Sequence, residues 1–119
     1  MSNCSATEIA RSVAAGECSA EAYAADALAR IRQHNPSINA VTAVTEDRAL
    51  AEARDIDARR LRGEALPPLA GVPYVVKNLY DVEGLVTLAG SAMRHKSAPA
   101  AEDAILIQNL KKDGAILIG

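Results

Sequence analysis

One lysine in an apolar segment is the side chain of this sequence best placed to do chemistry. Residues 72–80 read VPYVVKNLY, and in an extended strand Lys77 shares a face with Val75 and Leu79. Burial disfavours the charged ammonium form, and a neutral amine can act as a general base or a nucleophile. The alternative is structural: near a sheet edge, the stem of Lys77 covers apolar surface while its amine reaches water. The strand pattern alone leaves both interpretations open.

The remaining reactive side chains do not have the spacing of a metal, cofactor or redox site. Cys4 and Cys18 lack a second cysteine pair or a histidine at metal-ligand spacing, so we interpret them as structural thiols. The glycines of the loop 81–91 do not fit a phosphate-binding or dinucleotide-binding pattern. We therefore expect neither a metal ion nor a cofactor.

The composition carries no signal for nucleic acid or membrane. The 119 residues include 13 Lys and Arg against 15 Asp and Glu, a net charge of -2, so no basic surface is expected. No run of 18 apolar residues and no secretory signal is present, which predicts a cytoplasmic protein. Without Phe or Trp the chain can bury only a modest core. It is therefore expected to be part of something larger.

Three helices and a strand are predicted in the first half of the chain. Helices are expected over 6–15 and 19–32, where apolar residues recur at helical spacing, and Pro36 is expected to stop the second one. These two helices are predicted to form a hairpin. Residues 38–44 are β-branched and short, which favours a strand. A third helix is expected over 45–61, capped by its first residue.

The second half is predicted to contain two strands and a helix. A Pro- and Gly-rich loop over 66–71 leads into the strand 72–80, and the loop 81–91 follows. A helix is expected over 103–112 and a buried strand over 115–119. Both faces of the first strand are mainly apolar, which is typical of an interior strand covered on two sides. We therefore predict an α/β fold, with a mixed sheet flanked by helices.

The segment around the lysine carries a family pattern. The string LAGVPYVVKNLYDVEG, followed by Thr87 and by Gly90-Ser91, resembles the opening block of the amidase signature family. Gly-Val-Pro precedes an apolar strand, the lysine stands at its end, and Asp-x-x-Gly and Thr-x-x-Gly-Ser follow in the family's order. The flanking segments agree as well, so the likeness covers nearly the whole chain. It implies the N-terminal portion of the amidase signature fold.

The resemblance implies that Lys77 is the catalytic base of a Ser-cisSer-Lys triad, which uses no metal and no cofactor. Both serines belong to a Gly-Gly-Ser-Ser-Gly-Gly-type segment that this sequence does not contain. Ser91 is the one serine weighed as a substitute nucleophile, and His34 and His95 have no role in the family. The apolar end of the chain is also more typical of the interior of a sheet than of a terminus.

We therefore expect residues 1–119 to be the N-terminal part of a single amidase domain. Residues 1–64 would supply the helical hairpin, a strand and the third helix. Residues 65–119 would supply the catalytic-lysine strand, its loop, a helix and the last strand. The isolated chain is predicted to be incomplete and inactive, because a base without its nucleophile cannot form an acyl-enzyme.

Asn78 indicates a branch of the family. Members commonly have Asp directly after the lysine, and the Asn78 form most resembles the branch that hydrolyses biuret and carboxybiuret. This implies an amidohydrolase acting on a small amide substrate, with a small accessory subunit or a homo-oligomer as partner and no direct contact with nucleic acid or membrane. Two alternatives stay open: an amidotransferase A-subunit, which is a glutaminase for charged tRNA, and a truncated, catalytically inactive interaction domain.

Overall fold

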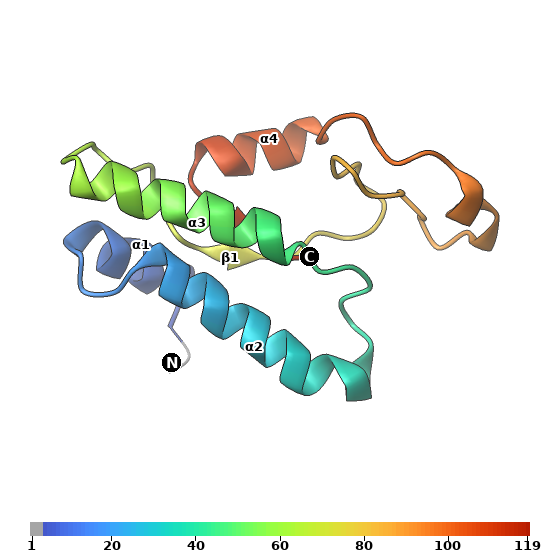
Figure 1. Ribbon diagram of the computed structural model, residues 1–119, viewed down its shortest axis with the longest axis horizontal. Coiled ribbons are helices and arrows are strands. Elements are labelled where there is room, and N and C mark those ends of the chain that lie inside the picture. Colours follow the sequence, from blue (N-terminus) through green and yellow to red (C-terminus); the bar gives the residue numbers. More distant parts are fainter. Residues whose placement is uncertain (1–3) are drawn as a thin grey trace.

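The computed structural model describes residues 4–119, and all four predicted helices are present (Figure 1). In chain order the elements are α1 (Ala6–Ala15), α2 (Ala20–Ile38), α3 (Glu46–Leu61), β1 (Pro73–Tyr74), the 3-10 helix η1 (Ala92–Lys96), α4 (Ile105–Lys112) and β2 (Ile116–Leu117). None of the helices within 4–119 is long and apolar enough to cross a membrane.

The two strands pair in parallel near the centre of the structure. Pro73 lies opposite Ile116 and Tyr74 opposite Leu117. The Ile116 N–H donates to the Val72 carbonyl at 2.8 Å, and the Ile118 N–H donates to the Tyr74 carbonyl at 3.0 Å. The predicted strand over 115–119 is therefore confirmed at its centre, as a short parallel partner of β1.

Helices cover both faces of this sheet, as predicted. Ile116 and Ile118 are buried among side chains of α1, α2 and α3. Leu117, which points to the other face, is buried with Ile107 of α4 and with Val82. This alternation is the two-residue period of a strand that is covered on both sides. The α/β architecture expected from the sequence is confirmed.

The helix caps follow the sequence closely. Ser5 and Glu8 form a capping box at the start of α1, and Gly16 ends that helix at a φ of 74°. At the start of α2, the Ser19 hydroxyl accepts a hydrogen bond from the Ala22 N–H at 3.0 Å. Side-chain oxygens thus satisfy backbone donors at the N-termini of both helices.

A second cap on α2 comes from a different helix. The Asp57 carboxylate on α3 accepts hydrogen bonds from the Ala20 N–H at 2.8 Å and from the Glu21 N–H at 3.0 Å. These donors have no partner within α2, because they belong to its first turn. Asp57 therefore fixes the start of α2 against the last turns of α3.

Replacing Asp57 by alanine is expected to lower the free energy of unfolding by about 1–2 kcal/mol, because two backbone donors lose their acceptor. Asp55 is a matched control on the same helix, since its side chain is exposed and makes no hydrogen bond within residues 4–119. The Asp55→Ala change is expected to stay within about 0.5 kcal/mol. Denaturant unfolding of both variants measures the difference, and equal losses would contradict the cap.

Two predictions about α2 were wrong. The helix does not stop at Pro36 but continues to Ile38, and Asn39 ends it at a φ of 48°, donating its N–H to the Asn35 carbonyl at 2.7 Å. Pro36 lies only two residues before the end of α2, and its lack of an N–H removes one backbone hydrogen bond from the helix. The hydrogen bond from the Asn39 N–H to the Asn35 carbonyl still completes the last turn. The expected hairpin of the first two helices is not the main helix pair, because α2 packs along α3 (Figure 1).

The strand predicted over 38–44 is also absent from the structure. The Asn35 side chain holds this connection instead, donating to the Val41 carbonyl and accepting from the Val41 N–H, both at 2.8 Å. Thr45 precedes α3, but its hydroxyl donates to the Leu117 carbonyl at 2.7 Å rather than capping the helix. Side-chain hydrogen bonds thus replace the sheet pairing that β-branched residues favoured.

Candidate functional site

The lysine singled out by the sequence lies just beyond the end of β1. The Val76 N–H still bonds across to the Gly119 carbonyl at 3.0 Å, but the chain then turns. The Lys77 carbonyl accepts from the Leu79 N–H at 2.7 Å and from the Tyr80 N–H at 3.2 Å. The prediction of one strand as far as residue 80 was therefore wrong, because the peptide groups after Lys77 bond within a turn instead of across a sheet.

The environment of Lys77 also differs from the expected buried face. Its side chain is exposed, and the neighbours Val75 and Leu79 are 54% and 46% exposed. Within residues 4–119 no second layer covers this side of the chain. In the described residues the Lys77 side chain therefore reaches solvent, as the structural interpretation of this lysine expected. The large apolar side chains of Val75 and Leu79 beside it are also exposed.

A cavity of about 420 Å³ adjoins Lys77. Its polar side chains are those of Thr42, Lys77, Asn78, Tyr80, Thr87 and His95, and no aspartate or glutamate of the described chain lines it. The rest of the wall is apolar or backbone, from Ala40, Val41, Ala43, Val75, Val76, Val82, Leu85, Val86, Leu88 and Gly119. A small pocket of this kind favours a compact ligand that is neutral or anionic.

The loop after Lys77 is held by its own polar residues. The Thr87 hydroxyl, which is largely buried, donates to the Asp81 carboxylate at 2.5 Å. The Asn78 side chain accepts a hydrogen bond from the Leu88 N–H at 2.9 Å, and the Asn78 carbonyl accepts from the Ala89 N–H at 2.7 Å. These contacts give Asp81 and Thr87, two residues of the family pattern, a structural purpose.

The structure brings some candidates together and separates others. Asn78, Thr87 and His95 join Lys77 in the cavity wall, whereas Ser91 does not line it. Neither Asn78 nor His95 was predicted from the sequence to take part in the site. For Asn78 a signal was available, because Asn between a strand and a loop commonly bonds backbone groups. The position of His95 follows from the fold of the whole loop, so no local signal could have placed it.

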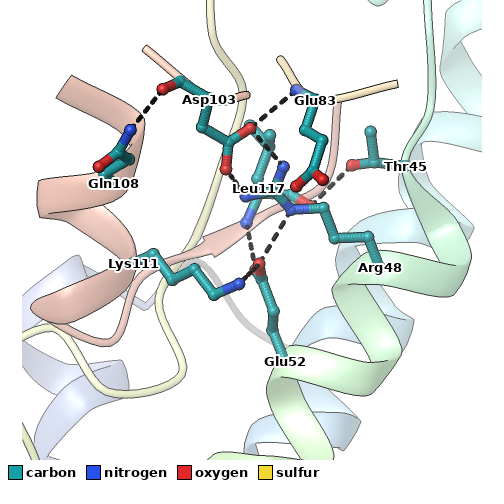
Figure 2. Close-up of polar contacts among 8 residues, drawn as sticks. All are labelled: Thr45, Arg48, Glu52, Glu83, Asp103, Gln108, Lys111 and Leu117. Carbon is teal, nitrogen blue, oxygen red and sulfur yellow. Dashed lines mark hydrogen bonds and ion pairs between the residues drawn. The ribbon is translucent and has the colours of Figure 1, made fainter. Parts of the chain in front are cut away.

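A network of charged side chains anchors the far end of this loop to α3 (Figure 2). Arg48 binds the Asp103 carboxylate through two hydrogen bonds of 2.8 and 2.7 Å, and its Nε donates to Glu52 at 2.9 Å. Asp103 also accepts from the Glu83 N–H at 2.9 Å. Lys111 of α4 lies 3.6 Å from Glu52. Local sequence patterns give no signal for this network, because Asp103 lies 55 positions from Arg48 in the chain.

These contacts shift the ionisation of the groups involved. The hydrogen bonds from Arg48 lower the pKa of the Asp103 carboxyl, and the same contacts raise the pKa of Arg48. Burial raises the pKa of the nearby Tyr74 to about 12, and the Arg48 cation partly offsets that rise. The charged forms of Arg48 and Asp103 thus stabilise each other between the loop and α3.

The lowered pKa of Asp103 predicts an acid-sensitive fold. Above the unfolded value of about 3.9, the carboxyl is ionised in both states and its stabilisation is fully present. The stabilisation is lost as the pH falls through the lower pKa of the folded state, because the unfolded chain binds the proton first. Denaturant unfolding at a series of pH values below about 4 should show a shallower decline for Asp103→Asn than for the unchanged protein. Equal slopes would contradict this assignment.

Among residues 4–119 there is no group of three or more His, Cys, Asp or Glu side chains that could hold a metal ion. The polar side chains that line the cavity supply an amine, an amide, hydroxyls and an imidazole.

The family model described as Amidase matches residues 23–119. AtzE of Pseudomonas sp. (strain ADP), which is part of 1-carboxybiuret hydrolase, is 53% identical over 112 residues, which are 94% of this chain and 24% of that protein. The A-subunit of Glutamyl-tRNA(Gln) amidotransferase from Rhodopirellula baltica is 38% identical over 115 residues, 97% of this chain and 23% of that protein. The chain thus spans about a quarter of the length of these relatives.

Two solved structures have a fold similar to that of this chain. A chain from a vestigial protein complex, described as revealing the origins of an s-triazine catabolic enzyme, has a TM-score of 0.96 and 51% identity, over 98% of this chain and 25% of that one. A bacterial aryl acylamidase of the amidase signature enzymes has a TM-score of 0.89 and 25% identity, over 98% of this chain and 24% of that one. The described fold is thus similar to about a quarter of each of these larger chains.

Proposed function

The chain belongs to the amidase signature family, and from this premise we propose that it supplies the catalytic base of an amidohydrolase that cleaves the C–N amide bond of a small substrate. The observation that carries the proposal is the position of Lys77. It lies three residues beyond the end of the parallel strand β1 and lines a cavity, and no carboxylate of residues 4–119 lies within 4.0 Å of its amine. With no carboxylate holding it in an ion pair, the Lys77 amine is available to contact a serine supplied by the rest of the protein.

In the proposed reaction, Lys77 acts through two serines supplied by the rest of the protein. The neutral amine takes a proton from a bridging serine, which takes one from the nucleophilic serine as its oxygen bonds to the amide carbon. Backbone N–H groups stabilise the resulting oxyanion. The proton then passes to the leaving nitrogen as the C–N bond breaks, and water hydrolyses the acyl-enzyme.

We propose further that residues 1–119 are the N-terminal part of a single amidase domain, with β1, Lys77 and the loop after it in 65–119. The large exposed side chains near the cavity support this, since Val75, Leu79 and Tyr80 are each at least 38% exposed. A further layer of the same domain would cover them and remove water from Lys77. The isolated chain is accordingly proposed to be inactive.

Among small amides, we favour substrates of the biuret type over glutamine. The relative from 1-carboxybiuret hydrolase is 53% identical, whereas the amidotransferase relatives are 38–41% identical. Because both kinds of relative are named as subunits, the intact protein is also proposed to work with a partner subunit.

The test is ammonia release by the full-length protein, supplied in turn with biuret and with L-glutamine. Faster turnover of biuret supports the proposal, and preferential turnover of glutamine would favour the amidotransferase alternative. Inactivity of the full-length protein, with its partner subunit present, on both amides would favour the inactive interaction domain.

A further inference from the structure

The amide group of Asn78 has a fixed orientation beside Lys77. Its side chain contacts the Leu88 N–H at 2.9 Å, and only the Oδ1 atom can accept that hydrogen bond. The backbone carbonyl of the same residue accepts from the Ala89 N–H at 2.7 Å. Two hydrogen bonds therefore attach Asn78 to the loop. The bond to Oδ1 fixes the orientation of the side-chain amide, so that the NH2 group lies on the side away from the Leu88 N–H.

That NH2 group has no acceptor within residues 4–119, although Asn78 is only partly exposed and belongs to the cavity wall. A primary amide has two N–H donors on its nitrogen, and Asn78 Nδ2 is not among the buried polar atoms of residues 4–119 that lack a partner, so solvent or a ligand can reach it. Lys77 is the adjacent residue in the same wall, and no carboxylate of the described chain lines the cavity. The Asn78 donors are therefore available to a ligand that enters next to Lys77.

We propose that the Asn78 Nδ2 group donates a hydrogen bond to a carbonyl oxygen of the substrate and so helps to select small acyl ureas and amides. This inference rests on the proposed amide hydrolysis, because it assumes that the cavity beside Lys77 receives the substrate. Asn78 binds and orients the substrate, and Lys77 moves the proton. The required ligand chemistry is a compact molecule with an acceptor oxygen on the side of Asn78.

Asn78→Asp in the full-length protein tests the assignment with biuret as the probe. The aspartate keeps an oxygen that accepts from the Leu88 N–H, but it replaces the NH2 donors by a second acceptor. We expect KM for biuret to rise about tenfold or more, with little change in Tm. Asn109→Asp is the matched control, since Asn109 is exposed on α4 and away from the cavity, and it should leave KM unchanged.

The added carboxylate also stabilises the ammonium form of Lys77, so the comparison is made across a pH series. That effect lowers turnover at low pH and disappears on the alkaline plateau, whereas loss of the donor raises KM at every pH. Asn78→Ser, which is neutral and short, gives the same measurement if Asn78→Asp does not fold. A KM within twofold of the unchanged enzyme on the plateau would overturn the assignment.

Failure of the proposed function gives a different result from failure of this inference. If the unchanged full-length enzyme released no ammonia from biuret or glutamine, the catalytic proposal would fail. Biuret binding, measured by calorimetry on the unchanged protein, on Asn78→Asp and on Asn109→Asp, still tests the Asn78 donor in that case. Equal dissociation constants for the three proteins would remove Asn78 from the binding site.

Discussion

Replacing Lys77 by arginine is expected to lower kcat/KM for amide hydrolysis by the full-length enzyme by about 10²–10⁴-fold or more. A guanidinium stays protonated at any working pH and cannot accept the serine proton, although it keeps the charge and much of the length of the lysine. Lys77→Ala should be equally inactive. Because Lys77 is exposed in the described chain, neither change is expected to disturb the folding of residues 4–119.

The control for this prediction is Lys112→Arg, the same chemical change at an exposed position on α4. It should retain full activity. Retention of most activity by Lys77→Arg would mean that the lysine only pairs with an anion elsewhere in the protein, and the proposed function would lose its residue-level support.

The second large effect is expected at Arg48, whose replacement by methionine should lower the free energy of unfolding by about 3–5 kcal/mol. The methionine fills a similar space but leaves the carboxylates of Asp103 and Glu52 without their main partner, and their side chains are only 9% and 11% exposed. Removing one member of such a buried ion pair costs more than the pair contributes, because the remaining charge stays desolvated. Denaturant unfolding measures the loss.

Arg32→Met is the control for this change, because Arg32 pairs with Glu46 on the surface, with side chains 59% and 49% exposed. It should cost at most about 1 kcal/mol. The double variant Arg48→Met with Asp103→Leu should be more stable than Arg48→Met alone, since the unpaired carboxylate is then gone. Equal losses for Arg48→Met and Arg32→Met would show that the network around α3 contributes no more than a surface pair.

Those parts of the fold that depend on local interactions were predicted correctly from the sequence. The end of α1 at Gly16 and the start of α2 at Ser19 depend on contacts within a few residues, so their spacing predicted them correctly. The apolar alternation in 115–119 likewise predicted a strand covered on both faces, which Leu117 and its neighbours confirm. The family pattern around Lys77 predicted the amidase family, which the comparisons confirm.

The errors arose where partners distant in the chain compete with local preference. Residues 38–44 favoured a strand by composition, but Asn35 binds Val41 and no neighbouring strand within 4–119 is available to pair. The strand ending at Tyr74 was predicted too long for the same reason, because strand formation depends on a partner that the sequence does not identify.

Residue types at short spacing were enough to identify the family, the helices and the lysine that the proposed chemistry needs. The three-dimensional arrangement was needed to show that Asn78 is locked beside Lys77 and that Arg48 joins Asp103 across 55 positions. It also shows Lys77 exposed rather than buried. Burial and long-range pairing depend on which segments meet in space, and spacing along one chain does not carry that information.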